Sequence, residues 1–209
     1  MKVTVIDAGV GNLGNVARAL SAVGAEVAVT REAEAIAASR CLVLPGVGAF
    51  RPPREALRGE PEAALREALA AGAWLLGICV GFQILFEEGE EHGVTDGLGL
   101  LPGRVTRLPE EVILPHMGWN RLATRTEHPL LATLPAQAWF YFVHSYAPHE
   151  VPATSVLAEA THGRTFPAVA GRGRVLGTQF HPEKSDRAGL ALLARFLELA
   201  HGDRPAARP

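Results

Sequence analysis

The sequence predicts an α/β protein with a mostly parallel central sheet, helices on both of its faces, and extra antiparallel strands in the C-terminal half. In the first half of the 209 residues, short apolar runs alternate with helical patterns, which is typical of parallel sheets. After Gly97, short β-like segments follow one another with turns between them. Because the chain is 48% hydrophobic and has the length of one ordinary domain, we expect a single domain over residues 1–201.

The first half contains four expected strands, each a short and mostly apolar run. They are Lys2–Asp7, Glu26–Thr30, Cys41–Leu44 and the run that begins at Ala73. The helical patterns between them are Asn15–Val23, Glu32–Ser39 and Arg54–Ala71, the last with the composition of a surface helix. Ligands bind beyond the carboxyl ends of the strands in such sheets, so chemistry is expected in the segments that follow them.

The second half is expected to hold short strands and one long helix. The β-like segments are Gly103–Leu108, Trp139–Ser145, Ser155–Ala160, Val169–Ala170 and Val175–Phe180, and the helix is Asp186–Leu199. Residues 202–209 (GDRPAARP) are expected to form a disordered tail. No internal repeat and no linker divides the chain.

Composition excludes several classes of function. A net charge of −2 offers no basic surface of the kind that binds nucleic acid. The sequence has no apolar run of about 18 residues and no charged-then-apolar leader, so we expect neither a membrane span nor export. Two cysteines, Cys41 and Cys79, form no disulfide framework, which suits a reducing compartment. We therefore expect a soluble, cytoplasmic protein.

The stretch Gly77-Ile78-Cys79-Val80-Gly81 has the pattern of a nucleophile elbow. An apolar strand turns into a helix through small residues, with Cys79 at the turn in the place that serine takes in the G-x-S-x-G motif. The glycines are needed because side chains at those positions would collide with the strand and the helix. A thiol there also lies at a helix N-terminus, which favours the thiolate. The alternative is an inert core cysteine, as most free cysteines are.

A base for this nucleophile is available in His181-Pro182-Glu183, which follows the strand Val175–Phe180. In an extended backbone residues i and i+2 point the same way, so Glu183 could orient the His181 ring. Thr178 lies on the same alternation. His181 would act as general base towards Cys79 and then as acid towards the leaving group. Cys41 begins its strand instead of ending it, so we expect it to be structural.

Acyl transfer at Cys79 also requires an oxyanion hole. One donor would be the backbone N–H of Val80 at the start of the helix. The other would come from the glycine turn Pro45–Phe50, in which the N–H groups of Val47 and Gly48 can turn inward. The alternative is that these glycines serve only a tight turn.

Two other types of site have weaker support in the sequence. Gly9-Val10-Gly11-Asn12-Leu13-Gly14 formally matches G-x-G-x-x-G between a strand and a helix, and Arg31 could then contact a 2′-phosphate. However, no acidic ribose ligand ends the second strand, so nucleotide binding is the minor alternative. The remaining histidines show no paired metal-ligand spacing, and we expect neither a metal nor a cofactor.

Several motifs resemble those of a known family. The motifs G-I-C-V-G-F-Q, P-G-V-G-A-F and Q-F-H-P-E-K, in the order Cys…His-x-Glu, resemble the class I (triad) glutamine amidotransferases. The α/β-hydrolases differ, because their acid precedes the histidine. Within the class, four stretches are similar to the glutaminase subunits of imidazole glycerol phosphate synthases. These stretches are Asp7–Asn12 (DAGVGN), Pro45–Phe50, Pro115–Asn120 (PHMGWN) and Tyr141–Tyr146 (YFVHSY).

The resemblance implies a flavodoxin-like class I amidotransferase fold and a reaction. Cys79, with His181 and Glu183, would hydrolyse L-glutamine through a thioester to glutamate and ammonia. Ammonia would pass to a cyclase subunit, a (β/α)8 barrel, that makes imidazole glycerol phosphate and an aminoimidazole carboxamide ribotide (AICAR) in L-histidine biosynthesis. The positions that match glutamine-binding residues of the family are Gln83, Glu91, His144, Ser145 and Tyr146.

The resemblance also implies a heterodimer with that cyclase. Because free ammonia in water is mostly ammonium, a docked subunit that seals the site would keep the nucleophile from being lost. The expected sealing face comprises Asp7–Asn12, Pro45–Phe50 and Pro115–Asn120. Its candidate contact residues are Asn12, Asn15, Pro115, His116, Met117, Gly118, Trp119 and Asn120.

The chain departs from the family pattern at three positions. Ala8 stands where an aromatic residue is usual, Phe82 where Met is common, and Ala147 where a second aromatic residue often follows HSY. None belongs to the expected triad, and the segments that carry them would lie near the partner. Two rival interpretations remain. One is the glutaminase subunit of another class I enzyme such as pyridoxal phosphate synthase, and the other is a non-catalytic flavodoxin-fold protein with a redox-sensing Cys79.

Overall fold

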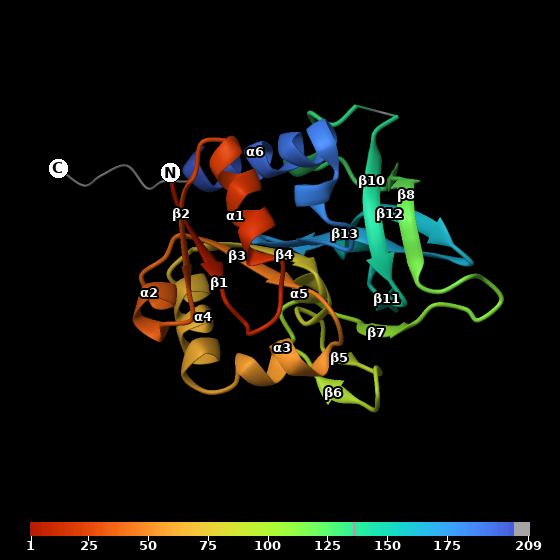
Figure 1. Ribbon diagram of the computed structural model, residues 1–209, viewed down its shortest axis with the longest axis horizontal. Coiled ribbons are helices and arrows are strands. Elements are labelled where there is room, and N and C mark those ends of the chain that lie inside the picture. Colours follow the sequence, from red (N-terminus) through yellow and green to blue (C-terminus); the bar gives the residue numbers. More distant parts are fainter. Residues whose placement is uncertain (136, 203–209) are drawn as a thin grey trace.

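A computed structural model of the chain describes residues 1–135 and 137–202. Its centre is an eight-stranded sheet with the order β2-β1-β3-β4-β14-β13-β12-β9 (Figure 1). The first five strands in this order run parallel and the last three are antiparallel. The parallel half and the antiparallel half therefore meet between β14 and β13. β14 is a parallel strand although it follows the change of pattern after Gly97.

The five parallel strands follow the sequence closely. They are β1 (Lys2–Ile6), β2 (Glu26–Thr30), β3 (Cys41–Gly46), β4 (Trp74–Cys79) and β14 (Val175–Thr178). β3 and β4 are buried along almost their whole length, because helices cover both faces of the sheet at its centre. Parallel strands buried on both faces read as continuous apolar runs, and this is the pattern from which they were predicted.

Helices cover the two faces of the sheet in separate groups (Figure 1). α1 (Leu13–Ala22) and α6 (Asp186–Gly202) lie together on one face, and α2 (Ala33–Ala37) and α4 (Glu60–Ala70) lie together on the other. The single helix expected over Arg54–Ala71 is wrong, because α3 (Arg51–Ala56) ends before α4 begins. Gly59 separates the two helices with a φ of 83°, a conformation that glycine adopts readily.

The second half forms antiparallel strands beside the parallel ones. β13 (Arg164–Arg172) and β12 (Val156–His162) extend the main sheet to β9 (Ala123–Thr124). β10 (Trp139–His144) and β8 (His116–Arg121) form a separate two-stranded ribbon. The four strands β11 (Tyr146–His149), β7 (Arg104–Arg107), β5 (Glu88–Gly89) and β6 (Thr95–Asp96) make a small third sheet. The sequence did not predict β5, β6, β8, β9 or β11.

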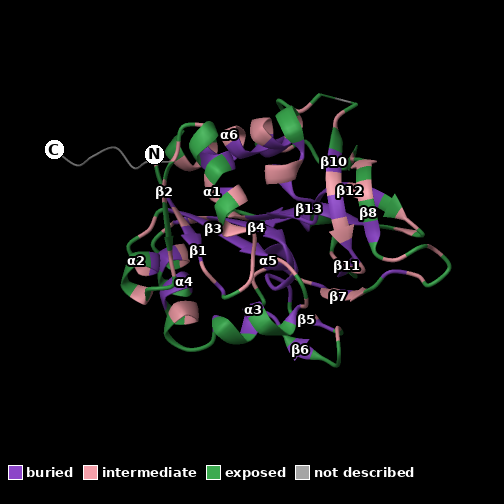
Figure 2. Ribbon diagram, viewed as in Figure 1, coloured by how far each residue is buried: buried purple, intermediate pink, exposed green. Residues whose placement is uncertain are grey.

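The core lies on both faces of the main sheet and continues under the ribbon (Figure 2). Its largest fully buried side chains are aromatic, and they are Phe50, Phe82, Phe86, Phe140, Phe142, Phe166, Phe180 and Phe196. The Phe180 ring contacts those of Phe140 and Phe142 at centroid distances of 4.4 and 5.5 Å. This aromatic cluster joins β10 to the segment that follows β14, and so it places the ribbon against the carboxyl edge of the sheet.

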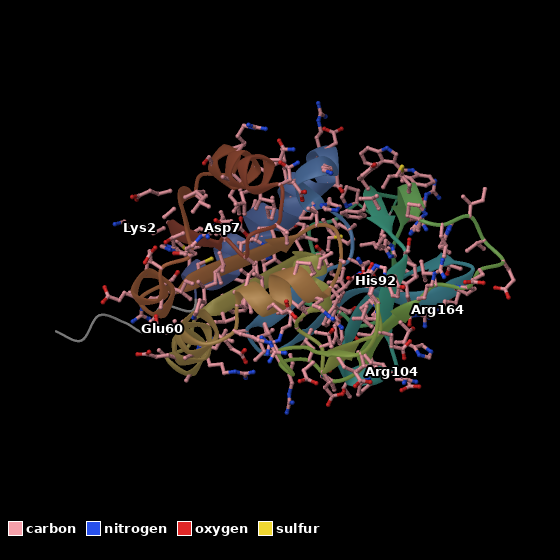
Figure 3. The ribbon with its side chains drawn as sticks, turned by 60° about the horizontal axis from the view of Figure 1, so that its bottom comes forward. Lys2, Asp7, Glu60, His92, Arg104 and Arg164 are labelled. Carbon is pink, nitrogen blue, oxygen red and sulfur yellow. The ribbon has the colours of Figure 1, made fainter. Side chains whose placement is uncertain are left out.

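One arginine fastens the small third sheet to β13. Arg164 Nη2 donates to Thr106 Oγ1 at 2.7 Å and to the carbonyl oxygen of Ala147 at 3.3 Å. Figure 3 shows Arg164 and Arg104 on the same side of the molecule, away from Lys2 and Glu60. Because Ala147 belongs to β11, Arg164 holds in place the segment that carries Ser145 and Tyr146.

The C-terminal end differs from the expectation. α6 includes Gly202, so any tail begins later than predicted, and residues 203–209 lie outside the described residues. In the part of the chain that is described, no helix has the length and apolar character needed to cross a membrane.

Candidate active site

Cys79 ends β4 in the geometry of a nucleophile elbow. Its backbone has φ 54° and ψ −110°, a conformation that is strained for a residue with a side chain. α5 (Val80–Gln83), which follows at once, is a single turn. The helix expected after the elbow is therefore present but short, and a single turn supplies little of the helix dipole that was expected to favour the thiolate.

The glycines around the elbow allow close backbone approach, as predicted. A Cβ on Gly77 would lie 2.7 Å from the Cα of Phe82, and one on Gly81 would collide with the carbonyl oxygen of Leu44. A Cβ on Gly46 would lie 2.6 Å from the backbone nitrogen of Gly81. Gly46 was predicted only as part of the glycine turn, without this packing role. These three glycines let α5 sit directly on β3 and β4, which brings the oxyanion turn close to Cys79.

The sheet topology brings His181 to Cys79. β14 is the parallel neighbour of β4, with Thr178 paired to Ile78, so both chains leave the sheet at the same edge. Beyond β14, the backbone N–H of His181 donates to the carbonyl oxygen of Tyr141 at 2.9 Å, which ties this segment to β10. Residues about 100 positions apart in sequence are thus neighbours because their strands are adjacent.

His181 and Glu183 form a buried pair. His181 Nδ1 and Glu183 Oε1 are 2.8 Å apart, and the two side chains are 2% and 1% exposed. The pairing was predicted from an extended backbone, but the local structure is a 3-10 turn, η3 (Pro182–Lys184). Burial alone would lower the pKa of His181. The Cys79 sulfur and the Glu183 carboxylate outweigh burial and raise this pKa to about 10, so the ring is a cation at neutral pH.

A cavity of about 360 Å³ opens beside this pair. It is lined by Val47, Gly48, Cys79, Val80, Gln83, Glu91, Pro115, Val143, His144, Ser145, Tyr146, His181 and Lys184. All residues predicted for catalysis, the oxyanion hole and glutamine binding are in this set except Glu183, which lies behind His181. Val143 and Lys184 were missed, although Lys184 stands in the motif Q-F-H-P-E-K. A volume of this size accommodates a small polar metabolite.

The predicted oxyanion turn lies next to the nucleophile. Gly46, at the end of β3, is paired in register with Cys79, so Val47 and Gly48 begin beside the elbow. Gly48 has a φ of 85°, which glycine adopts at little cost. The turn is anchored at its far end, where the Phe50 N–H donates to Glu91 Oε2 at 2.8 Å. Glu91 therefore contacts both the turn and the cavity.

Gln83 and Gln179 connect the cavity wall to the sulfur. Gln83 Nε2 donates to the carbonyl oxygen of Tyr146 at 2.8 Å and to Gln179 Oε1 at 3.1 Å. Gln179 Nε2 in turn lies 3.8 Å from the Cys79 sulfur. Gln179 is fully buried and was not predicted as a site residue. Its polar character inside an apolar strand end was the signal that could have identified it.

The residues predicted at a partner interface fall into two groups. Met117 and Trp119 are 63% and 50% exposed on β8, and Pro115 is exposed at the mouth of the cavity. His116 is only 5% exposed, because alternate residues of a strand face opposite ways, and so it cannot be a direct surface contact in this state. The predicted contact at His116 is corrected accordingly.

The other predicted contact residues lie on β8 or at the start of α1. Asn120 is half-buried and, with Gly118, shares the inner side of β8. At α1, Asn12 caps the helix by accepting from the Asn15 N–H at 3.4 Å, and Asn15 also bonds Arg18. Asn12 and Asn15 are half-buried.

Cys41 and Arg31 both have structural partners in the fold. Cys41 pairs in register with Trp74 at the opposite end of the strands, and burial raises the pKa of its thiol to about 12, so it is structural as predicted. Arg31, the candidate contact for a 2′-phosphate, binds Asp7 Oδ2 at 2.6 Å. The Arg31 guanidinium lowers the pKa of that carboxyl. The Arg31 guanidinium is therefore already paired within the chain.

Comparison with known proteins agrees with this geometry. The profile of the family described as glutamine amidotransferase class-I matches residues 4–199. The chain is 50% identical to the imidazole glycerol phosphate synthase subunit HisH of Symbiobacterium thermophilum, over 93% of this chain and 92% of that protein. It is 42% identical to the subunit of the same name from Bacillus subtilis, over 94% and 95% of the two chains.

Solved structures are similar as well. A structure titled "Crystal structure of glutamine amidotransferase" has a TM-score of 0.76 at 25% identity, over 95% of this chain and 98% of that one. The structure of PurLQS from Thermotoga maritima has a TM-score of 0.74 over 95% and 98%, and at 17% identity it shows likeness of fold alone. The chain therefore belongs to the class I glutamine amidotransferase family and, within it, to the HisH subunits of imidazole glycerol phosphate synthase.

Proposed function

We propose that the chain hydrolyses L-glutamine at Cys79 and delivers the ammonia to the cyclase subunit of an imidazole glycerol phosphate synthase, in L-histidine biosynthesis. The observation that carries this proposal is the cavity that holds together a strained cysteine, its histidine and the predicted glutamine-binding residues. Membership of the HisH subunits favours this partner over that of a pyridoxal phosphate synthase. A buried acid–histidine pair also favours hydrolysis over redox sensing, because a sensor thiol needs no oriented proton donor.

In the first half of the reaction, Cys79 Sγ attacks the carboxamide carbon of glutamine. The carbonyl oxygen becomes an oxyanion, which the N–H groups of Val80 and of the Val47–Gly48 turn would stabilise. His181 is cationic before the attack, since its pKa is about 10, so it can give a proton to the leaving nitrogen. The C–N bond breaks, ammonia leaves, and a thioester remains on Cys79.

In the second half, His181 acts as a base. The neutral ring accepts a proton from water, whose oxygen attacks the thioester carbon, and glutamate leaves as the C–S bond breaks. Glu183 keeps the Nδ1 proton in place throughout, so that Nε2 is the nitrogen that exchanges protons. Nε2 is buried and has no hydrogen-bond partner among the described residues, which leaves it available to the sulfur and the substrate.

Glutamine recognition would use the remaining cavity residues. Glu91 supplies a carboxylate for the substrate ammonium group, while Ser145 and Tyr146 border the same space. The amide nitrogen of Gln83 already donates to Tyr146 and Gln179. Gln83 would therefore form part of the cavity wall and would not bind the substrate through that nitrogen. Lys184 lies at the cavity with Nζ 5.6 Å from the centre of the Tyr141 ring.

The partner surface would include the outer side of the β8–β10 ribbon. Met117, Trp119 and Trp139 are 63%, 50% and 46% exposed, and Arg121 stacks on Trp139 at 4.5 Å. Large exposed apolar side chains that share one face are typical of interfaces. Pro115 joins this face to the cavity, so a partner docked here would cover the point where ammonia leaves. The two buried thiols fit an enzyme of the reducing cytoplasm.

The experiment compares the chain alone with the chain in complex with its barrel subunit. Glutamate formation should rise strongly when the partner and its nucleotide ligand are added. Cys79→Ala should abolish glutamine-dependent synthesis and leave synthesis from added ammonia intact. A glutamine-analogue alkylator should label Cys79 in competition with glutamine. Loss of both activities in Cys79→Ala, or equal glutamine turnover with and without the partner, would refute the proposal.

A further inference from the structure

A continuous chain of hydrogen bonds runs from β8 to the Cys79 sulfur. On its first part, Asn120 Nδ2 lies 3.3 Å from His116 Nε2, His116 Nδ1 lies 3.0 Å from His144 Nε2, and His144 Nδ1 lies 2.8 Å from the carbonyl oxygen of Tyr146. The same carbonyl oxygen accepts from Gln83, which continues to Gln179 and so to the sulfur.

The proton on each histidine of this chain can be assigned. A carbonyl oxygen only accepts, so His144 Nδ1 must carry a proton and donate it to Tyr146. Burial, opposed by the hydrogen bond to Tyr146, lowers the pKa of His144 to about 3, so the ring is neutral and its Nε2 is an acceptor. His116 Nδ1 must then donate to it.

The far end of the chain is consistent with this assignment. Burial lowers the pKa of His116 to about 4, so its Nε2 is unprotonated and accepts from Asn120. The Asn120 amide is oriented independently, because Nδ2 also donates to the Thr161 carbonyl oxygen at 3.0 Å and Oδ1 accepts from the Arg121 N–H at 2.8 Å. His144 Nδ1 and Gln83 Nε2 both donate to the Tyr146 carbonyl oxygen. Because a carbonyl oxygen only accepts, the hydrogen-bond chain fixes the positions of its members but cannot conduct a proton.

The chain lies in the interior, where such bonds are hard to replace. His116, His144, Gln83 and Gln179 are 5%, 6%, 3% and 0% exposed. A buried donor or acceptor that loses its partner is costly, so a displacement at one end is opposed by the whole chain. On the same strand, Met117 and Trp119 point outward. One face of β8 therefore holds these exposed apolar residues, and the other face holds Asn120 and His116, where the hydrogen-bond chain starts.

We propose that Asn120, His116 and Gln179 are positioning residues, and that this hydrogen-bond chain lets the outer face of β8 set the place of the Cys79 sulfur. The inference rests on the proposed function, since it assumes that a partner occupies that face. Contact with Met117 and Trp119 would fix β8, and through His144 and the Tyr146 carbonyl it would hold Gln179 Nε2 against the sulfur. An N–H directed at sulfur stabilises the thiolate that attacks glutamine.

The decisive test separates hydrogen bonding from packing at His116. This ring stacks on Phe142 at 4.8 Å and on His162 at 4.3 Å, so a packing role is the competing explanation. His116→Phe keeps the stack and loses the chain, whereas His116→Asn keeps an N–H near Nδ1 and loses the stack. We expect His116→Phe to reduce, about tenfold, the activation that the cyclase produces, and His116→Asn to retain most of it.

A matched control is available in the same cluster. His162→Phe keeps the stack on His116 and removes none of the hydrogen bonds between Asn120 and Cys79, since His162 Nε2 bonds the Ile113 carbonyl oxygen. It should retain activation within about twofold of wild type. If His116→Phe keeps full activation, or His116→Asn loses more than His116→Phe, the ring acts by packing and the inference is wrong.

Two readouts do not depend on glutamine turnover, so they distinguish failure of this inference from failure of the proposed function. Alkylation of Cys79 by iodoacetamide should be about tenfold slower in Gln179→Met than in wild type, with Cys79→Ser giving the background from Cys41. In the ¹⁵N spectrum, His116 and His144 should both carry the proton on Nδ1. An unchanged alkylation rate, or a proton on Nε2 of His144, would overturn the inference.

Discussion

Replacing Glu183 by Gln should nearly abolish glutamine hydrolysis while the fold is retained. The carboxylate accepts from His181 Nδ1 at 2.8 Å and cannot donate, so it keeps the proton on that nitrogen. A glutamine amide can donate as well as accept. It can therefore bind the ring with its proton on Nε2, a form that cannot act as a base towards water.

The magnitude follows from the pKa of His181. The pKa of His181 rises from 6.5 to about 10 although burial lowers it. This rise corresponds to about 5 kcal/mol in favour of the cation. The Cys79 sulfur contributes more to this rise than the Glu183 carboxylate does. Loss of the carboxylate charge therefore removes less than half of it, about 2 kcal/mol, or roughly a 30-fold rate. The wrong tautomer extends this loss towards the roughly 10⁴-fold that the equivalent change costs in serine proteases.

The assay is the pH dependence of kcat in the complex with the cyclase. Cationic His181 is present below pH about 10 and is lost as the pH rises through that value, so wild-type activity should fall there. The stability that this group contributes is likewise fully present below pH 6.5 and is lost as the pH rises through about 10. In Glu183→Gln the alkaline fall should move about 1–2 pH units lower.

The matched control is Glu110→Gln. Glu110 is 77% exposed and pairs with Arg107 on the surface, so its loss should change neither the rate nor the pH profile. Activity of Glu183→Gln within about tenfold of wild type, or an alkaline limb that does not move, would refute the role assigned to the pair.

Three further predictions concern stability and assembly. Gly81→Ala forces a Cβ against the Leu44 carbonyl, so it should cost about 3 kcal/mol and lower Tm by about 6–12 °C in calorimetry, whereas Gly202→Ala, in open space, should be neutral. Glu62→Gln leaves the buried Arg54 without its 2.7 Å ion pair and should cost about 3 kcal/mol in urea unfolding; a change below about 0.5 kcal/mol would contradict this. Trp119→Ala should weaken binding of the cyclase by about 2 kcal/mol in titration calorimetry while Tm of the isolated chain stays unchanged, and unaltered affinity would exclude this face from the interface.

The parallel half of the fold could be predicted because its signals are local. Apolar runs such as Glu26–Thr30 coincide with their strands, and their alternation with helices predicts that the strands run parallel. β8 was missed because its pattern is inverted: the apolar Met117 and Trp119 are exposed, while the polar His116 is buried. The split between α3 and α4 was missed because one glycine inside a helical pattern is usually tolerated.

The candidate site could be predicted for residues at the carboxyl ends of strands, because these ends lie together at one edge of the sheet. Cys79 and His181 both follow strand ends, and parallel pairing brings those ends together. Gln179 also follows the end of β14, but its contact with Gln83 could not be predicted, because that contact depends on how α5 packs. Likewise, the burial of His116 depends on the pairing of β8 with β10, which no local pattern specifies.

The β8–β10 ribbon has a consequence for handling the isolated chain. In the described part of the chain, β10 is the one strand paired to β8, so the other edge of β8 presents backbone groups beside Met117 and Trp119. An apolar strand edge of this kind is a template for pairing with another copy. Expressed without its partner, the chain should therefore self-associate through this ribbon as its concentration rises. Co-expression would keep it soluble by occupying the edge as the chain folds.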